Sequence, residues 1–187
     1  QAAMLVAVTP QIAANLEALY RHPNIRIATN GYAQECDIAC EKTFREPIQI
    51  VYAGSFNFNT RCERLLQAYS MLKRRRPEAA AQLAIDLYGP SGYYFRVFLR
   101  RHVRGSVRFR GYLPFNRLMD ALCGYDLAFS CAARDISFSS KTYHYLNAGL
   151  PILGAASGMG LRDFIRENEI GLACDHTASA LMQALQE

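Results

Sequence analysis

The chain has 187 residues, of which 51% are hydrophobic and 20% charged, with a formal net charge of +5. This balance is typical of one compact domain, or of one domain with part of another. No apolar run approaches the roughly 18–20 residues that cross a bilayer as a helix. The modest positive charge suits anionic small molecules, anionic lipid surfaces or nucleic acid, without choosing among them.

The chain begins QAAMLVAVTP, with neither the basic segment that opens a secretory signal nor an initiator methionine. We therefore expect a fragment of a longer protein. Six cysteines are spread along the chain, and the closest pair, Cys36 and Cys40, has no second pair at zinc spacing. We interpret the cysteines as reduced, mostly buried thiols of a cytoplasmic protein and expect no metal site.

Short apolar runs alternate with helical patterns along the chain. Nearly continuous apolarity, without alternation, indicates parallel strands covered on both faces. The predicted strands are 3–8, 25–29, 48–54, 83–89, 106–111, 126–131, 151–155 and 170–174. The predicted helices are 10–20, 61–75, 93–104, 115–123, 140–148, 161–167 and 177–186.

Strands that alternate with helices favour an α/β fold, a Rossmann-like open parallel sheet with helices on both faces. The segment 32–47 has mixed charge and no period, and we interpret it as a linker. Residues 48–187 then form one Rossmann-like domain, and residues 1–31 are the trailing strand, helix and strand of a preceding domain.

Ligands of open α/β sheets bind beyond the carboxyl ends of the strands. The first strand of the regular series ends at Gly54 and Ser55, which do not belong to a GxGxxG sequence, and no acidic residue closes the next strand. This pattern argues against a dinucleotide fold of the NAD type.

The stretch SFSSKTYHYLNAGLPIL predicts a helix capped by Ser139 or Ser140 and ended by Gly149 and Pro151. Lys141 lies in the first turn, where the helix dipole disfavours a cation unless an anion such as phosphate lies between them. The alternative is an exposed lysine that costs the helix little stability.

Helical spacing places His144, Tyr145 and Ala148 on the face of Lys141. We expect Lys141 and His144 to reach one ligand, although a lone histidine is more often structural. The opposite face, with Tyr143, Leu146 and Leu150, is the expected core face.

In order along the chain, the segments TNG, IVYAGSF, LAIDLYGP, VRFRGYLP, LMDALCGYDLAFSC and SSKTYHYLNAGLPIL resemble the C-terminal half of glycosyltransferase family 4, which has the two-domain GT-B architecture. The resemblance covers nearly the whole chain. It implies a domain that holds a UDP- or GDP-sugar donor and needs no cofactor or metal. It also implies an acceptor site on a missing N-terminal domain, and transfer that retains configuration.

The resemblance also implies a role for particular residues, with no catalytic residue assigned. Gly54 and Ser55 approach the diphosphate, and Arg110, Gly111, Tyr112 and Leu113 border the base. Ser139, Ser140 and Lys141 meet the phosphates, while His144 stands where many members have a ribose-binding glutamate.

The chain departs from the family pattern at several positions. Ile136 and His144 occupy the two positions of a common Glu-x7-Glu motif, and Ser55 replaces a frequent arginine. The downstream lysine falls near Thr60, so that Arg61 is the candidate substitute. These departures keep open a non-catalytic module that binds a nucleotide or a partner; a nucleotide-sugar epimerase is a weaker alternative.

Basic residues crowd the segments 73–76 and 96–110. A solvated helix face is the common reason for such runs, and peripheral contact with the inner face of a membrane is the alternative. No nucleic-acid motif or aromatic stacking platform is present, and we expect no nucleic-acid partner.

Overall fold

The computed structural model describes residues 2–31, 46–56, 61–90, 92–132 and 139–187. Its main feature is a sheet of six parallel strands in the order β5-β4-β3-β6-β7-β8. The strands are β3 (Ile48–Ala53), β4 (Leu83–Tyr88), β5 (Val107–Gly111), β6 (Leu127–Ala132), β7 (Ile152–Ala156) and β8 (Gly171–Asp175). The predicted α/β class and parallel sheet are confirmed.

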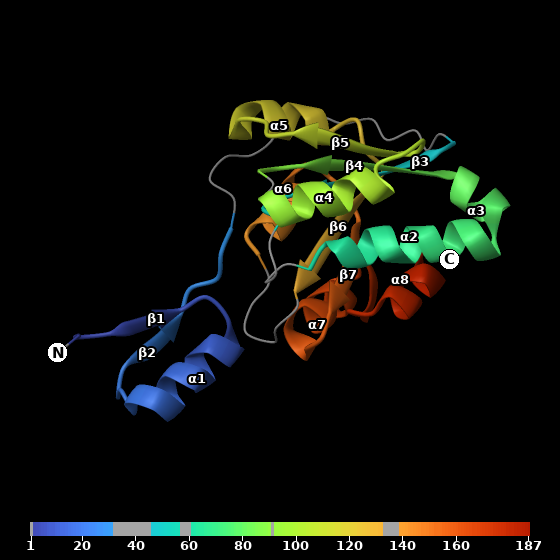
Figure 1. The fold of residues 1–187 in the computed structure, drawn as a ribbon. Coiled ribbons are helices and arrows are strands. Elements are labelled where there is room, and N and C mark those ends of the chain that lie inside the picture. Colours follow the sequence, from blue (N-terminus) through green and yellow to red (C-terminus); the bar gives the residue numbers. More distant parts are fainter. Residues whose placement is uncertain (1, 32–45, 57–60, 91, 133–138) are drawn as a thin grey trace.

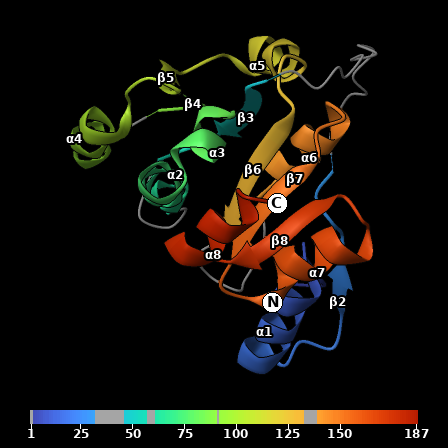
Figure 2. The ribbon, with the colours of Figure 1, turned by 90° about the vertical axis from the view of Figure 1, so that its right-hand side faces the viewer.

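Helices cover both faces of this sheet (Figures 1 and 2). One face carries α2 (Glu63–Arg75), α3 (Pro77–Ala81), α4 (Tyr93–His102) and α8 (Ala178–Ala184). The other face carries α5 (Phe115–Leu122), α6 (Lys141–Asn147) and α7 (Met159–Glu167). Alternate residues of each strand enter the two cores: Ile50 and Tyr52 pack toward α2, and Val51 and Ala53 toward α6. Burial on both faces explains why the strands read as continuous apolar runs.

The strand order reverses between β3 and β6, because β4 and β5 follow on one side and β7 and β8 on the other. The two central strands pair only at Ile50–Leu127 and Val51–Ala128. Beyond these pairs the strands diverge toward their carboxyl ends. A reversal of this kind is the topological switch point at which open α/β sheets bind ligands.

A smaller parallel pair of strands, β1 (Leu5–Ala7) and β2 (Ile25–Ile27), is joined by α1 (Pro10–Tyr20). Thr9 caps α1 by accepting a hydrogen bond from the Ile12 backbone N–H at 3.2 Å. These elements agree with the predicted strand, helix and strand. No residue of α1 is buried, and its Leu19 and Tyr20 are exposed. The division at 31 and 47 stays a prediction, since most of the predicted linker lies outside the described residues.

The structure corrects the predicted faces of α6. Thr142 and Tyr145 are fully buried. Of the predicted core face, Leu150 is buried as expected, whereas Tyr143 and Leu146 are half-buried. Tyr143 packs against Phe164 of α7 at a ring-centroid distance of 5.8 Å. In a helix of seven residues, a few strong contacts set the rotation, and the apolar pattern alone cannot.

The cysteines are a second correction. Cys62, Cys131 and Cys174 are free thiols, as predicted, but Cys123 is disulfide-bonded. Sequence spacing does not reveal which cysteines approach each other in space. Within the described residues, no helix is long and apolar enough to cross a membrane.

Candidate functional site

The side chain of Tyr145 bonds to the last residue of β3, at which β3 no longer pairs with β6. Its hydroxyl accepts a hydrogen bond from the Ala53 N–H at 2.8 Å and donates to the Ala53 carbonyl at 3.1 Å. The phenol thus takes the place of a neighbouring strand for the last residue of β3. This contact anchors α6 beside the end of β3 and brings its first residue, Lys141, to the switch point.

Lys141 lies against the end of β3 although the two are far apart in the chain. Its Nζ is 4.1 Å from the ring centroid of Tyr52, a residue with no exposed surface. The Tyr52 hydroxyl donates to the Ser55 carbonyl at 2.9 Å and so orders the turn after the strand. A β-carbon on Gly54 would lie 3.2 Å from Lys141 Nζ. A side chain at this position would therefore push the ammonium group away from the backbone by a few tenths of an ångström.

The start of α6 differs from the predicted cap. Ser140 has helical backbone angles and makes no side-chain capping hydrogen bond. Instead the Lys141 N–H donates to Ser139 Oγ at 3.5 Å, which is long for such a bond. Both serines, which precede Lys141 in the chain, are exposed, and so is Ser55.

Two buried thiols lie below Lys141. Burial raises the pKa of Cys62 to about 12, and nearby Cys131 adds to the rise while the Lys141 charge opposes it. Burial also raises the pKa of Cys131. Both groups are neutral thiols at physiological pH, so Lys141 has no thiolate partner in them.

His144 lies toward the connection between β5 and α5. Its ring packs edge-on against Phe115, the first residue of α5, with centroids 4.8 Å apart. Nδ1 of His144 is buried and has no hydrogen-bond partner among the described residues. Burial lowers the pKa of His144. The histidine is therefore half-buried, and it borders the segment predicted to hold the base.

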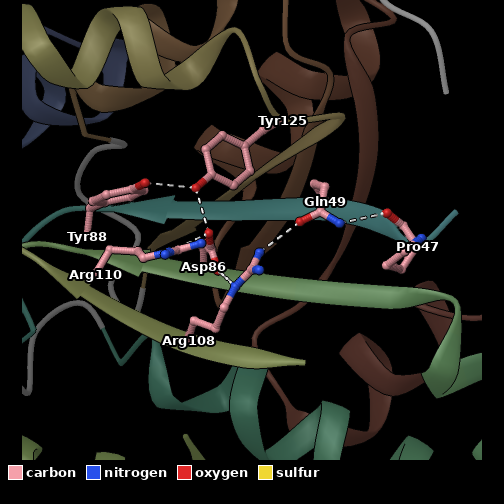
Figure 3. A network of polar contacts seen from close by, with 7 residues as sticks. All are labelled: Pro47, Gln49, Asp86, Tyr88, Arg108, Arg110 and Tyr125. Carbon is pink, nitrogen blue, oxygen red and sulfur yellow. Dashed lines mark hydrogen bonds and ion pairs between the residues drawn. The ribbon is translucent and has the colours of Figure 1, made fainter. Parts of the chain in front are cut away.

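That segment is anchored by a buried carboxylate (Figure 3). Asp86 of β4 is 2% exposed and accepts from Arg108 Nε at 2.6 Å, Arg110 Nε at 2.9 Å and the Tyr125 hydroxyl at 2.8 Å. Burial raises the pKa of Asp86, and the hydrogen bonds from Arg108, Tyr125 and Arg110 outweigh it, so the pKa lies below its ordinary value. The Tyr88 and Tyr125 hydroxyls are 2.9 Å apart.

The Asp86 network limits the predicted role of Arg110, because one of its nitrogens is committed to a structural ion pair. Gly111 follows with φ of +77°, and Tyr112 is 69% exposed. Sequence patterns missed Asp86, since cross-strand pairs become visible only when strand register is known.

The predicted residues thus fall into three places. Gly54, Ser55, Ser139, Ser140 and Lys141 gather at the switch point. His144 and the segment 110–113 lie at the start of α5, and Arg61 is exposed before α2. Ile136 and Thr60 lie outside the described residues. The roles of all these residues stay predictions.

A separate cavity of about 310 Å³ lies between the N-terminal elements and the helices α6 and α7. Its polar lining includes Thr9, Gln11, Asp163 and Glu167 and no basic side chain. This chemistry does not suit a diphosphate. Within the described part of the chain, no group of three or more histidine, cysteine or carboxylate side chains could hold a metal ion.

Comparison with known proteins identifies the fold. No protein-family model matches the chain, and no curated protein sequence matches it significantly. Solved structures do. The chain has the Rossmann-like fold of GT-B glycosyltransferase domains. WaaG, described as a glycosyltransferase involved in lipopolysaccharide biosynthesis, superposes with a TM-score of 0.77 at 18% identity, over 97% of this chain and 52% of WaaG.

Two further similar structures contain UDP. Anabaena HepE, solved with UDP and glucose, has a TM-score of 0.72 at 17% identity over 99% of this chain and 53% of its own. A variant of Staphylococcus aureus TarM, solved with UDP and other ligands, has a TM-score of 0.74 at 13% identity. The match covers 98% of this chain and 37% of TarM. This chain therefore spans only about a third to a half of the length of these enzymes.

Proposed function

We propose that this chain is the donor-binding half of a glycosyltransferase related to family 4, which transfers a sugar from a UDP- or GDP-sugar to a hydroxyl acceptor with retained configuration. The observation that carries the proposal is the approach of Lys141 to Gly54 at the switch point of a Rossmann-like sheet. Similar structures of HepE and TarM contain UDP, which supports a nucleotide donor here.

The role of this domain in the reaction is to stabilise the departing nucleoside diphosphate. The Lys141 ammonium is a compact cation that donates charge-assisted hydrogen bonds to phosphate oxygens. The exposed turns at Gly54–Ser55 and Ser139–Ser140 let a diphosphate approach the backbone. Groups fixed before the reaction stabilise developing negative charge without reorganisation.

In this role, no residue of this chain is assigned to acceptor binding or to the catalytic step. Since the chain spans about half of the enzymes it resembles, an N-terminal domain is the expected partner that supplies the acceptor site. We expect the 187 residues alone to bind nucleotide and to transfer no sugar. A full-length protein in the cytoplasm is the setting in which activity is expected.

A non-catalytic nucleotide-binding module is the second candidate. It is favoured by His144, an uncharged side chain packed edge-on against Phe115 at a position where many family 4 enzymes have a glutamate. Both candidates bind nucleotide, and only the first transfers sugar when the whole protein is supplied.

Thermal unfolding against a panel of nucleotides and nucleotide-sugars tests the proposal. A ligand at ten times its Kd stabilises the folded state by roughly 1.4 kcal/mol. We expect UDP or GDP, and the matching sugar conjugate, to raise the Tm, while AMP and inorganic sulfate do not. The absence of a shift with every nucleoside diphosphate at millimolar concentration would refute both candidates.

Membrane contact is a further proposal for the whole protein. Arg96, Arg100, Arg101 and Arg104 are exposed on α4 or directly after it, and juxtamembrane arginines are attracted to anionic lipid. We expect binding to vesicles with anionic lipid, weakened by salt and by the pair R100E/R101E. Equal binding to neutral vesicles would contradict it.

A further inference from the structure

The cavity of about 310 Å³ is a second concave site, which the donor-binding role does not use. Its size falls within the range of roughly 300–1,000 Å³ of small-molecule sites, which form preferentially where two structural units meet. One wall comes from the N-terminal elements, with Gln11 of α1 and Thr29 shortly after β2. The other wall comes from α6 and α7, with Tyr143, Asp163 and Glu167. A ligand in this cavity therefore contacts both units.

The two walls approach each other at the start of α7. A β-carbon on Gly160 would lie 3.7 Å from Oε1 of Gln11, an ordinary van der Waals distance. The Gln11 amide therefore lies beside the first turn of α7, the helix that carries both carboxylates. Asp163 and Glu167 are four residues apart, so they project from one face of this helix. The amide and the two carboxylates thus border one small volume.

The polar side chains of this lining are not used by the fold. Within the described residues, no hydrogen bond or ion pair engages the side chains of Gln11, Asp163 or Glu167. Thr9 of the same lining differs, because its hydroxyl accepts from the Ile12 N–H and caps α1. Ionised carboxylates only accept hydrogen bonds, whereas an amide both donates and accepts. Together these groups can bind neighbouring hydroxyl groups of one ligand.

The chemistry of the lining suits a neutral saccharide. Two carboxylates and no basic side chain disfavour a phosphate or another anion. A sugar hydroxyl donates to a carboxylate and also accepts from an amide N–H, which a cation cannot do. The rings of Tyr143 and Phe164, whose centroids are 5.8 Å apart, add apolar surface for the C–H face of a sugar ring. The lining therefore provides both kinds of contact that a pyranose makes.

We propose that this cavity binds the saccharide part of the acceptor, beside the donor site. The inference rests on the proposed function, which requires a hydroxyl acceptor near the donor diphosphate. Tyr143 follows Lys141 by two residues on α6, so the cavity and the proposed diphosphate site share one helix. An N-terminal domain then supplies only the remainder of the acceptor site. The ligand class is an uncharged, polyhydroxylated sugar.

A chemical-shift titration of the 187-residue chain tests the inference, because ¹H–¹⁵N spectra report binding residue by residue. The probes are glucose, galactose, mannose and N-acetylglucosamine, each up to tens of millimolar, with spermidine as a cationic comparison. At least one sugar should shift the amide signals of residues 8–11 and 160–167. Added salt should leave this binding unchanged, because the sugars carry no charge to screen.

Three variants test the walls of the cavity. Asp163→Asn and Glu167→Gln should each weaken binding of that sugar by about tenfold, the loss of one hydrogen bond to a charged group. Gln11→Ala, on the opposite wall, should weaken it by about three- to tenfold, the loss of a neutral hydrogen bond. None of the three should change the affinity for UDP or GDP. Glu169→Gln is the matched control, an exposed carboxylate outside the lining, and should change neither affinity.

The outcomes separate the inference from the proposed function. If no nucleoside diphosphate binds, the proposed function fails, and the acceptor role fails with it. If a nucleotide binds and no sugar shifts the cavity signals, or only spermidine does, the inference alone is overturned. Equal sugar affinities for the wild type and Asp163→Asn overturn it too. A weaker affinity of Asp163→Asn for UDP-glucose or GDP-mannose, with UDP and GDP unchanged, would assign the cavity to the donor's sugar instead.

Discussion

The ammonium group of Lys141 lies 4.1 Å from the centre of the ring of Tyr52, the second-last residue of β3. A cation over the face of a buried phenol is attracted by the ring and restrained by it. Tyr52 in turn holds the Ser55 carbonyl, so one side chain orders both the lysine and the turn opposite it. The Lys141 ammonium group is thereby held next to Gly54.

Lys141→Ala should weaken binding of the preferred nucleoside diphosphate by roughly 10- to 150-fold, since charge-assisted hydrogen bonds contribute about 1.5–3 kcal/mol. Lys141→Arg should restore only part of it, because a planar guanidinium places charge differently. Calorimetric titration with UDP and GDP measures both, and Lys73→Ala at the end of α2 is the control. Equal affinities for wild type and Lys141→Ala would show that the lysine does not bind the diphosphate.

The same variant should lower the free energy of unfolding by about 0.5–2 kcal/mol, the range for a cation–π contact whose ring is buried and whose cation is partly exposed. The sequence alone predicts no such loss, because a cation in the first turn opposes the helix dipole. Urea denaturation of the wild type and of Lys141→Ala distinguishes a loss of stability from no loss. A stability equal to or above that of the wild type would mean that the contact with Tyr52 contributes nothing.

Gly89→Ala should destabilise the fold by about 1–3 kcal/mol or more. Gly89 has φ of +140°, and a β-carbon there would lie 2.0 Å from the Gly54 carbonyl oxygen. The change must therefore displace the turn after β3 and should weaken nucleotide binding too. Gly124→Ala, whose β-carbon would meet only an ordinary contact at 3.5 Å, should stay within about 0.5 kcal/mol of wild type. Similar urea midpoints for the two variants would contradict this prediction.

Asp86→Asn should lower the free energy of unfolding by about 1–3 kcal/mol. The amide cannot accept from Arg108, Arg110 and Tyr125 at once as the carboxylate does. The cost stays below that of a fully buried ion pair, because both arginine side chains are more than 40% exposed. Chemical denaturation at neutral pH measures it, with exposed Asp120→Asn as the control. Equal losses in both variants would show that the Asp86 network does not stabilise the fold.

Stability should also fall as the pH is lowered below about 6.5, the ordinary pKa of histidine. The pKa values of His144 and His176 are lowered, chiefly by burial, so the unfolded chain binds more protons than the folded one in this window. Their contribution is fully present above pH 6.5 and is lost as the pH approaches the folded pKa values. The lowered pKa of Asp86 acts separately, since its stabilisation is lost only as the pH falls below about 3.9.

Urea midpoints at pH 7.5 and pH 5.5 measure the histidine effect. The double variant His144→Asn/His176→Asn should show a smaller difference between the two pH values than the wild type. A pH dependence that is unchanged in the double variant would assign the effect to other groups.

Much of the fold could be predicted from the sequence, because buried parallel strands and amphipathic helices have different apolar periods. Each of the eight strands in the described residues overlaps a predicted one, and α1 has its predicted bounds. The helix α3 was missed, since the five residues Pro77–Ala81 are too few to show a period. The rotation of α6 was wrong because the Tyr145 hydroxyl, a polar group, is what binds the helix to β3.

The sequence by itself determined the order of strands and helices, and therefore the edge of the sheet at which ligands are expected, because chain order and right-handed crossovers leave few topologies. Only the tertiary structure decided which side chains meet there. The approach of Lys141 to Tyr52 and Gly54 depends on the splay of β3 and β6. Such contacts join residues far apart in the chain, and no local propensity encodes them, since they follow from strand register and packing.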